Sequence, residues 1–192
     1  MLNPKPLILK SRIFSQMTAK SVLLSITFTR PKNDMTMEKL DALNQVAEFH
    51  RTFKHPIEPE PVIPAPKRCR LRVALLAEEL KELEKAIEDR DIVEVADALC
   101  DLQYVLSGAV LEFGLGEKFK ALFDEVQRSN MSKSCSTREE AEATVRYYKE
   151  QKGFDSYIAE ADGHWLVYRK SDNKTLKSVN YSPAGLEKIL EG

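Results

Sequence analysis

Two short acidic patterns on consecutive helical segments constrain this chain more than any other feature. The first pattern comprises Glu78, Glu79 and Glu82, and the second comprises Glu94, Asp97 and Asp101. At 3.6 residues per turn, the members of each pattern project close together from one helix. The second pattern lies inside an apolar run, so its carboxylates occupy positions where a helix normally presents its core face. That run is made of Val93, Val95, Ala96, Ala98, Leu99, Cys100, Leu102, Val105 and Leu106.

The negative charges of carboxylates this close together repel one another, and that repulsion must be offset. Two like charges about 4 Å apart repel by roughly 4 kcal/mol at an effective dielectric constant near 20. Protons, basic partners or bound cations can offset that repulsion, and the second stripe contains no Lys or Arg. Hard divalent cations are therefore favoured. Taken alone, Glu78 to Lys85 also fits a solvated helix with charge pairs, and it is the second cluster that favours a metal site.

The charge of the chain is unevenly distributed. The 192 residues carry 29 basic and 30 acidic side chains, a net charge of −1. The first 33 residues hold six of the basic side chains and none of the acidic ones, so the remainder carries 23 basic against 30 acidic, a net charge of −7. General nucleic-acid binding usually needs an excess of basic residues, so we do not expect this chain to bind nucleic acid. A polyphosphate substrate would need cations to approach this acidic part.

The cysteines and the N-terminal segment bear on localisation. Cys69, Cys100 and Cys135 are too dispersed for a disulfide framework or a zinc site, and Cys100 is expected to be a small core residue. We interpret the cysteines as reduced, which fits a cytoplasmic protein. The apolar stretch from Val22 to Phe28 is too short to span a bilayer. Residues 1–35 are expected to be a disordered or artefactual extension, and an organelle transit peptide is the alternative.

The fold class expected is mainly α. Thr36 is the expected N-cap of a first helix, on which His50 is interpreted as a core residue rather than a nucleotide contact. Five prolines between Pro56 and Pro66 predict an extended connector. The spacing of apolar residues predicts the further helices, and Gly114 and Gly116 are expected to end the third of them. The predicted helices are about 37–54, 67–88, 91–113 and 117–130, which together form a four-helix bundle over residues 36–135.

Residues 136–192 are expected to form a small α+β extension. Ser136 or Thr137 is the expected cap of a short helix, and a three-stranded β-meander is predicted over 156–160, 164–170 and 174–179. A last helix is expected to start at Ser182-Pro183. The extension's small core is expected to contain Trp165, Tyr168, Tyr147 and Tyr157.

The combined acidic pattern resembles the signature of a known family. Glu78-Glu79-x-x-Glu82, then eleven residues, then Glu94-x-x-Asp97, resembles the metal-binding signature of the MazG-like, all-α nucleoside triphosphate pyrophosphohydrolases. The run from Phe123 to Lys133 is similar to the dimeric subgroup with phosphoribosyl-ATP pyrophosphohydrolase-like and dUTP-cleaving members. The resemblance covers about residues 36–135.

The resemblance implies roles for individual residues. Glu79, Glu82, Glu94 and Asp97 would be ligands of Mg²⁺ or Mn²⁺, and Glu78 would be the base that orients water or a further ligand. Asn130 and Lys133 would contact the substrate phosphates, with Arg128 and Asp101 as additional candidates. Oxygen-only ligands suit these cations better than zinc. Helix-terminal Arg128 and Lys133 could instead complement a helix dipole.

The resemblance also implies an activity and an assembly. We expect hydrolysis of a nucleoside triphosphate to the monophosphate and pyrophosphate by a homodimer or a dimer of dimers, in nucleotide-pool house-cleaning. Three alternatives stay open: phosphoribosyl-ATP pyrophosphohydrolase of histidine biosynthesis, a di-iron carboxylate bundle and a non-catalytic helical dimerisation protein. The di-iron alternative needs Glu-x-x-His pairs, and no His occurs between His55 and His164.

Overall fold

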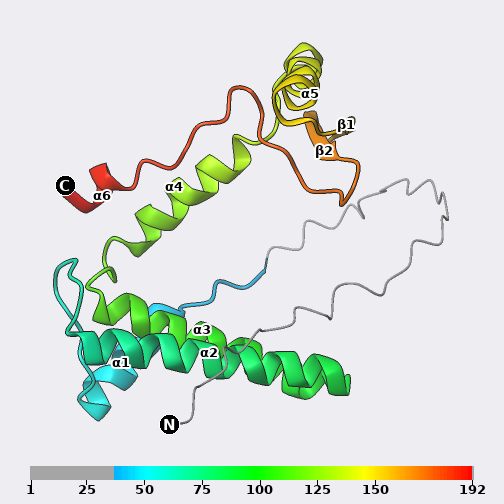
Figure 1. The fold of residues 1–192 in the computed structure, drawn as a ribbon. Helices are drawn as coiled ribbons and strands as arrows, with labels where there is room; N and C mark the ends of the chain where they lie inside the picture. Colours follow the sequence, from blue (N-terminus) through cyan, green and yellow to red (C-terminus); the bar gives the residue numbers. More distant parts are fainter. Residues whose placement is uncertain (1–36, 192) are drawn as a thin grey trace, which may run out of the picture. The chain divides into compact units, whose positions relative to one another are not determined.

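The computed structural model describes residues 37–191, and its contacts divide the chain into two units, residues 1–39 and 40–192. The expected N-cap Thr36 and the extension 1–35 lie outside the described residues. Within the second unit the described elements are mainly helical (Figure 1). They are α1 (Ala42–Phe53), α2 (Pro66–Asp89), α3 (Ile92–Glu112), α4 (Phe119–Met131), α5 (Arg138–Lys152), β1 (Ser156–Ala161), β2 (His164–Arg169) and α6 (Glu187–Glu191).

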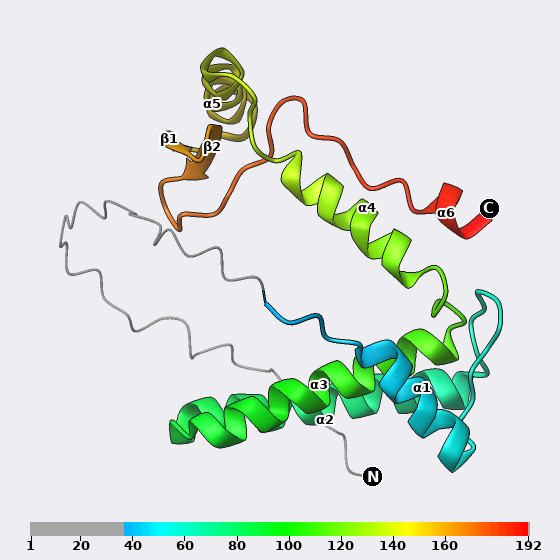
Figure 2. The same ribbon diagram turned by 180° about the vertical axis from the view of Figure 1, so that it is seen from behind.

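The helices α2 and α3 form an antiparallel pair joined by a very short turn, and they run side by side in Figures 1 and 2. Arg90 ends α2 in a left-handed conformation (φ 56°), which reverses the chain. Asp91 then caps α3, because its carboxylate accepts hydrogen bonds from the amides of Val93 (2.9 Å) and Glu94 (3.3 Å). The predicted ends of both helices are confirmed to within one residue.

The first helix is shorter than predicted. Residues 37–41 are not helical, and α1 begins at Ala42. It packs against α3, where Val46 and Ala47 bury themselves against Leu111. The predicted four-helix bundle is supported only as far as α1, α2 and α3 pack together.

The proline-rich connector has no helix or strand, as predicted, and it is fixed to the end of α3. The amide of Glu58 donates to the carbonyl of Leu111, and that of Val62 donates to the carbonyl of Phe113, both at 3.1 Å. Gly114 has φ +67°, and a Cβ there would overlap the carbonyl of Glu60. Glycine is therefore required where the connector crosses α3.

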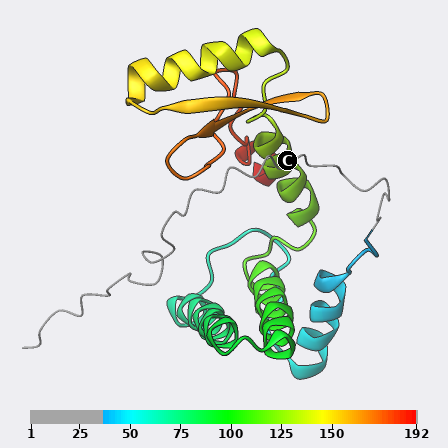
Figure 3. The same cartoon turned by 90° about the vertical axis from the view of Figure 1, so that its right-hand side faces the viewer.

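The C-terminal part contains one β-hairpin packed on α5, and Figure 3 shows α5 lying along the hairpin. Strands β1 and β2 pair antiparallel from Ser156↔Arg169 to Ala161↔His164. Asp162 and Gly163 both have positive φ, which is typical of a two-residue hairpin turn. The cap Thr137 is confirmed, because its hydroxyl accepts from the amide of Glu140.

The predicted third strand is not formed. Within the described chain, residues 174–179 make one isolated bridge to β2, between Thr175 and Tyr168. The following amides turn to side chains of α5 instead: that of Lys177 donates to the hydroxyl of Tyr148, and that of Val179 donates to the hydroxyl of Thr144. The sheet therefore has two strands.

The small core of this part also differs from the prediction. Trp165 packs on it, whereas Tyr147 and Tyr157 are exposed. Its buried centre consists of Cys135, Ala141, Val167 and Leu176. The last helix starts at Glu187, later than predicted, because residues 181–185 bind α4 through hydrogen bonds. No described helix is both long and apolar enough to cross a bilayer.

Candidate functional site

A groove of about 300 Å³ separates the acidic sides of α2 and α3, and we call it the α2–α3 groove. It is lined by Glu82, Lys85, Ala86, Asp89, Glu94, Asp97 and Ala98. Three of the four predicted metal ligands therefore share one hollow. The only basic lining residue, Lys85, is paired with Asp89 at 2.5 Å, four residues further along α2. Its ammonium is thereby directed to a carboxylate outside the predicted ligand set.

The fourth predicted ligand, Glu79, is half-buried beside the same carboxylates. Partial burial raises the pKa of Glu79, and the negative charges of Glu82, Asp101, Glu78 and Asp97 raise it further. The carboxylates of both helices are therefore close enough to repel one another. The two acidic stripes thus lie on neighbouring sides of α2 and α3.

The carboxylates are more exposed than their apolar flanks suggested. Glu82, Glu94 and Asp97 are exposed, and the flanking Val93 and Leu99 are exposed as well. Cys100, predicted to be a core residue, is also exposed. This side of α3 is thus a surface in the single chain, because α1 and α2 cover only part of its apolar circumference.

The side chains do not yet converge on one point. Among residues 37–191, no group of three or more His, Cys, Asp or Glu side chains is arranged to hold a metal ion as it stands. The donors still match a hard cation in kind, because they are all carboxylate oxygens. The exposed side chains can also change rotamer on the helix surface without disturbing a core.

The predicted phosphate contacts lie at the end of α4 and do not line the α2–α3 groove. Arg128 is bound to Glu125 through two hydrogen bonds (2.7 and 2.8 Å) and donates to the carbonyl of Pro183 (3.0 Å). The ammonium of Lys133 donates to the side-chain carbonyl of Asn130 at 2.8 Å. All three candidates thus have partners within the chain.

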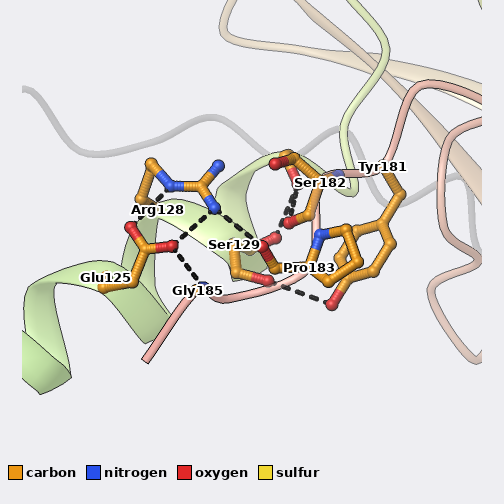
Figure 4. A network of polar contacts seen from close by, with 8 residues as sticks. Glu125, Arg128, Ser129, Tyr181, Ser182, Pro183 and Gly185 are labelled. Carbon is orange, nitrogen blue, oxygen red and sulfur yellow. Dashed lines mark hydrogen bonds and ion pairs between the residues drawn. The ribbon is translucent and has the colours of Figure 1, made fainter. Parts of the chain in front are cut away.

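The chain's own C-terminal tail occupies the polar side of α4, as Figure 4 shows. The amide of Gly185 donates to Glu125 (2.8 Å), and the amide of Ser182 donates to the hydroxyl of Ser132 (3.0 Å). The hydroxyls of Ser129 and Tyr181 are 3.0 Å apart. Because the bonds from Ser182 and Gly185 use backbone amides of the tail, the sequence carried little signal for them.

A buried ionic cluster was not predicted from the sequence. Glu112 is 1% exposed and pairs with Arg68 and Arg72 of α2. Burial alone raises the pKa of Glu112, but the hydrogen bonds from both arginines outweigh it, so the net pKa lies below its usual range. The spacing of Arg68 and Arg72, four residues apart on an otherwise amphipathic helix, was the available signal.

His50 extends this cluster. Its Nδ1 lies 2.8 Å from the carbonyl of Pro56, and its Nε2 lies 3.2 Å from Nη2 of Arg72. These partners fit a neutral ring with the proton on Nδ1. The prediction that His50 is a core residue is confirmed, since it is buried. Gly108 makes room for the cluster, because a Cβ there would lie 2.7 Å from Nη1 of Arg72.

Comparison with known proteins agrees with the acidic signature. The sequence model of the family described as phosphoribosyl-ATP pyrophosphohydrolase matches residues 46–130. The chain is also similar to the uncharacterized protein L479 of Acanthamoeba polyphaga mimivirus, with 23% identity over 244 aligned residues that cover 80% of this chain and 97% of the viral protein. The family match indicates, at a coarse level, hydrolysis of a nucleotide pyrophosphate bond. The matched residues 46–130 contain both acidic stripes, and the family whose model they match belongs to the MazG-like, all-α superfamily.

Proposed function

We propose that the chain is a metal-dependent nucleoside triphosphate pyrophosphohydrolase whose reaction takes place at the α2–α3 groove. One observation carries the proposal: Glu82, Glu94 and Asp97 line one groove between α2 and α3. Half-buried Glu79 adjoins them, and its pKa is raised first by burial and then by the negative charges of Glu82 and its neighbours. Evenly solvated surface charges would normally spread apart. An acidic cluster of this kind is suited to bind cations and, through them, a polyphosphate.

Glu79, Glu82, Glu94 and Asp97 would hold Mg²⁺ or Mn²⁺, because the donor set is made only of carboxylate oxygens from two adjoining helices. The bound cation would neutralise phosphate charge and lower the pKa of a water molecule. The residues themselves supply the framework: the short turn at Arg90 and Asp91 fixes one stripe against the other.

In the proposed reaction, a water oxygen forms a bond to the α-phosphorus. The bond between that phosphorus and the oxygen bridging to the β-phosphate breaks, which yields the nucleoside monophosphate and pyrophosphate. Glu78 would accept the proton that the water loses. It adjoins Glu79 in sequence and is exposed at the surface of α2, where water reaches it. Asp101, which is half-buried on α3, is the second candidate for this role.

Phosphate contacts by Arg128, Asn130 and Lys133 remain part of the proposal. To bind phosphate oxygens, Arg128 would have to release Glu125 and the carbonyl of Pro183. Lys133 and Asn130 would have to release each other. The ion pair between Arg128 and Glu125 is partly exposed, and surface ion pairs are worth about 0–1 kcal/mol, so its exchange would cost little. Fixed positioning of a triphosphate by such groups is what phosphoryl chemistry needs from a protein.

Two substrate classes fit the proposed site. A nucleoside or deoxynucleoside triphosphate, including dUTP, would place the enzyme in nucleotide-pool house-cleaning. Phosphoribosyl-ATP is the alternative, and the description of the matching family favours it. Both share the triphosphate that the acidic groove would bind through cations.

A homodimer or a dimer of dimers is part of the proposal. Large apolar side chains of α2 and α3 are exposed in the single chain, among them Leu80, Ile87, Val93 and Leu106. A second copy packed on these helices would bury them and complete a four-helix arrangement. A non-catalytic dimerisation protein would use the same surface. The three free cysteines suit the reducing cytoplasm, which is the proposed compartment.

The test is an assay of the purified chain with nucleoside triphosphates, deoxynucleoside triphosphates including dUTP, and phosphoribosyl-ATP, each with Mg²⁺ or Mn²⁺. Chromatography separates pyrophosphate from orthophosphate. We expect stoichiometric pyrophosphate and monophosphate that disappear on chelation with EDTA. Orthophosphate as the product would contradict the reaction class, and no product with any substrate would favour the dimerisation protein.

A further inference from the structure

The C-terminal tail, residues 177–185, begins at the end of α4 and is fixed there by backbone hydrogen bonds. The amide of Ser178 donates to the carbonyl of Lys133 at 3.2 Å, and the amide of Tyr181 donates to the carbonyl of Ser178 at 3.0 Å. The amide of Lys177 donates to the hydroxyl of Tyr148 on α5. These bonds place the backbone of Lys177 next to that of Lys133, although the two residues are distant in sequence.

The side chain of Tyr181 lies at the centre of a small basic cluster. The ammonium of Lys177 lies 4.0 Å from the centroid of the Tyr181 ring. The hydroxyl of Tyr181 is 3.0 Å from that of Ser129 (Figure 4), and this hydrogen bond lowers the pKa of Tyr181. The positive charges of Lys177 and Lys133 lower it further. Both ammonium groups therefore lie close to the same phenol.

The charges of these two ammonium groups are not neutralised within the described chain. Among residues 37–191, neither Lys133 nor Lys177 forms an ion pair, and the ammonium of Lys133 donates to the uncharged side chain of Asn130 at 2.8 Å. The neighbouring Arg128 differs, because it is paired with Glu125. The end of α4 and the tail thus present two uncompensated positive charges in a part of the chain that is otherwise net acidic.

The chemistry of the cluster suits a phosphate anion. An ammonium group binds phosphate oxygens as a point charge with three rotatable donors. Lys177 is exposed, so an anion in solution can reach it. A cation–π contact at an exposed site is weak, and phosphate can therefore replace the Tyr181 ring as the partner of the ammonium. The backbone bonds of the tail would hold Lys177 in place during that exchange.

We infer that the tail supplies Lys177 as a phosphate-binding residue, which together with Lys133 holds the triphosphate of the substrate. The inference rests on the proposed function and adds to it a residue outside residues 46–130, the part that the family model matches. Tyr181 would be a positioning residue, because its ring and hydroxyl connect the tail to α4. The carboxylates of the α2–α3 groove would bind phosphates through cations, whereas the two lysines would bind them directly.

Binding of inorganic tripolyphosphate in EDTA isolates the direct contact. Without divalent cations the carboxylates of the α2–α3 groove repel the anion, so calorimetric binding at low ionic strength reports on the basic groups. We expect Lys177→Gln to weaken this binding about tenfold, because it removes a charged hydrogen-bond donor. Lys174→Gln is the matched control. It removes the same charge from an exposed position that does not act on Tyr181, and it should change the affinity by less than about twofold.

A second readout separates phosphate binding from a purely structural role of Lys177. The amide of Gly185 donates to Glu125, so its hydrogen exchange reports whether the tail stays attached to α4. Lys177→Gln should leave this exchange unchanged, and Lys177→Arg should restore most of the affinity for tripolyphosphate. Faster exchange in Lys177→Gln would mean that the side chain anchors the tail, and it would overturn the role of Lys177 as a phosphate contact.

Pyrophosphate release by the same preparations separates the inference from the proposed function. With Mg²⁺ and a nucleoside triphosphate, Lys177→Gln should raise KM about tenfold, while Mg²⁺ still raises the melting temperature. An unchanged KM would overturn the inference and leave the reaction standing. Equal weakening by Lys174→Gln, or no binding of tripolyphosphate by the parent chain in EDTA, would also overturn it. Binding that depends on Lys177 in a chain that releases no pyrophosphate would instead overturn the proposed function.

Discussion

The carboxylate of Glu112, at the last residue of α3, is bound by the guanidinium of Arg72 from α2, and both side chains are buried. This pair ties the two helices of the candidate site together at the end opposite their connecting turn. Removing one member of a buried pair leaves the other charge without compensation, which typically costs about 3–5 kcal/mol.

We therefore predict that Glu112→Gln lowers the free energy of unfolding by about 3–5 kcal/mol in urea titrations. Arg68→Gln should cost clearly less, because the Arg68 side chain is 31% exposed and water can replace its contact. If both variants lower the free energy of unfolding equally, the exposure of the Arg68 side chain does not determine how much its ion pair stabilises the fold.

The pH dependence of stability should report on His50. Burial lowers the pKa of His50 below its usual 6.5, and the nearby charges of Arg72 and His55 lower it further, while the Pro56 carbonyl and Glu112 act in the opposite direction. The unfolded chain therefore binds the proton more readily, and stability should fall as the pH drops below about 6.5.

Unfolding midpoints at pH 7.5 and 5.5 measure this effect. His50→Gln should flatten the difference between them, whereas His164→Gln, in the exposed first position of β2, should keep the parental difference. If His50→Gln keeps the parental difference between the two midpoints, groups other than His50 cause the pH dependence.

Mg²⁺ or Mn²⁺ should raise the melting temperature. A cation that binds only the folded state adds about 2.7 kcal/mol at a hundredfold excess over Kd. Asp97→Asn should weaken this gain, whereas Asp155→Asn, which removes an exposed ion pair with Lys149, should preserve it. A melting temperature of the parent chain that does not respond to millimolar cation would remove the main support for the metal site.

Glu78 and Glu79 should differ in what their loss affects. If Glu78 accepts the proton from water, Glu78→Gln should lower kcat by about 10²–10⁴-fold while the cation still raises the melting temperature. Glu79→Gln should weaken both effects together, with partial recovery at higher cation concentration. Near-parental turnover in Glu78→Gln would redirect the search for the base to Asp101.

Attachment of the tail to α4 should depend on Glu125. Hydrogen bonds from Arg128 and from the amide of Gly185 lower the pKa of Glu125 to about 2. The stabilising contribution is therefore present above the usual value near 4.5 and is lost as the pH falls from there towards 2. Glu125→Gln should speed hydrogen exchange at the Gly185 amide at neutral pH. Asp124→Asn, which breaks only the pair with Lys120, should not change that exchange.

Local signals predicted the central helices well. The ends of α2 and α3 follow from Pro66 at the helix start, the reversal at Arg90 and the cap at Asp91, all of which act within a few residues. The opposition of the two acidic stripes follows from the same short turn. These features need no knowledge of distant contacts.

The errors arose where distant parts of the chain decide the outcome. Residues 174–179 have strand-like composition, yet side chains of α5 bind amides that a third strand would have given to β2. Cys100 has apolar neighbours in sequence, but no described helix covers its side of α3. The Glu112 cluster joins residues 40 and 44 positions apart, and its arginines look like ordinary surface residues in the sequence.

The turn between α2 and α3 has an evolutionary consequence. Because Arg90 and Asp91 alone separate the two helices, an added residue would be taken up either by a longer turn or by one of the helices. A residue taken up by a helix would rotate one stripe by about 100° relative to the other. Glu94 and Asp97 would then leave the groove while the helices themselves stayed intact. Among active descendants, this turn should consequently tolerate a change of residue more readily than an insertion or deletion, so selection should preserve its length.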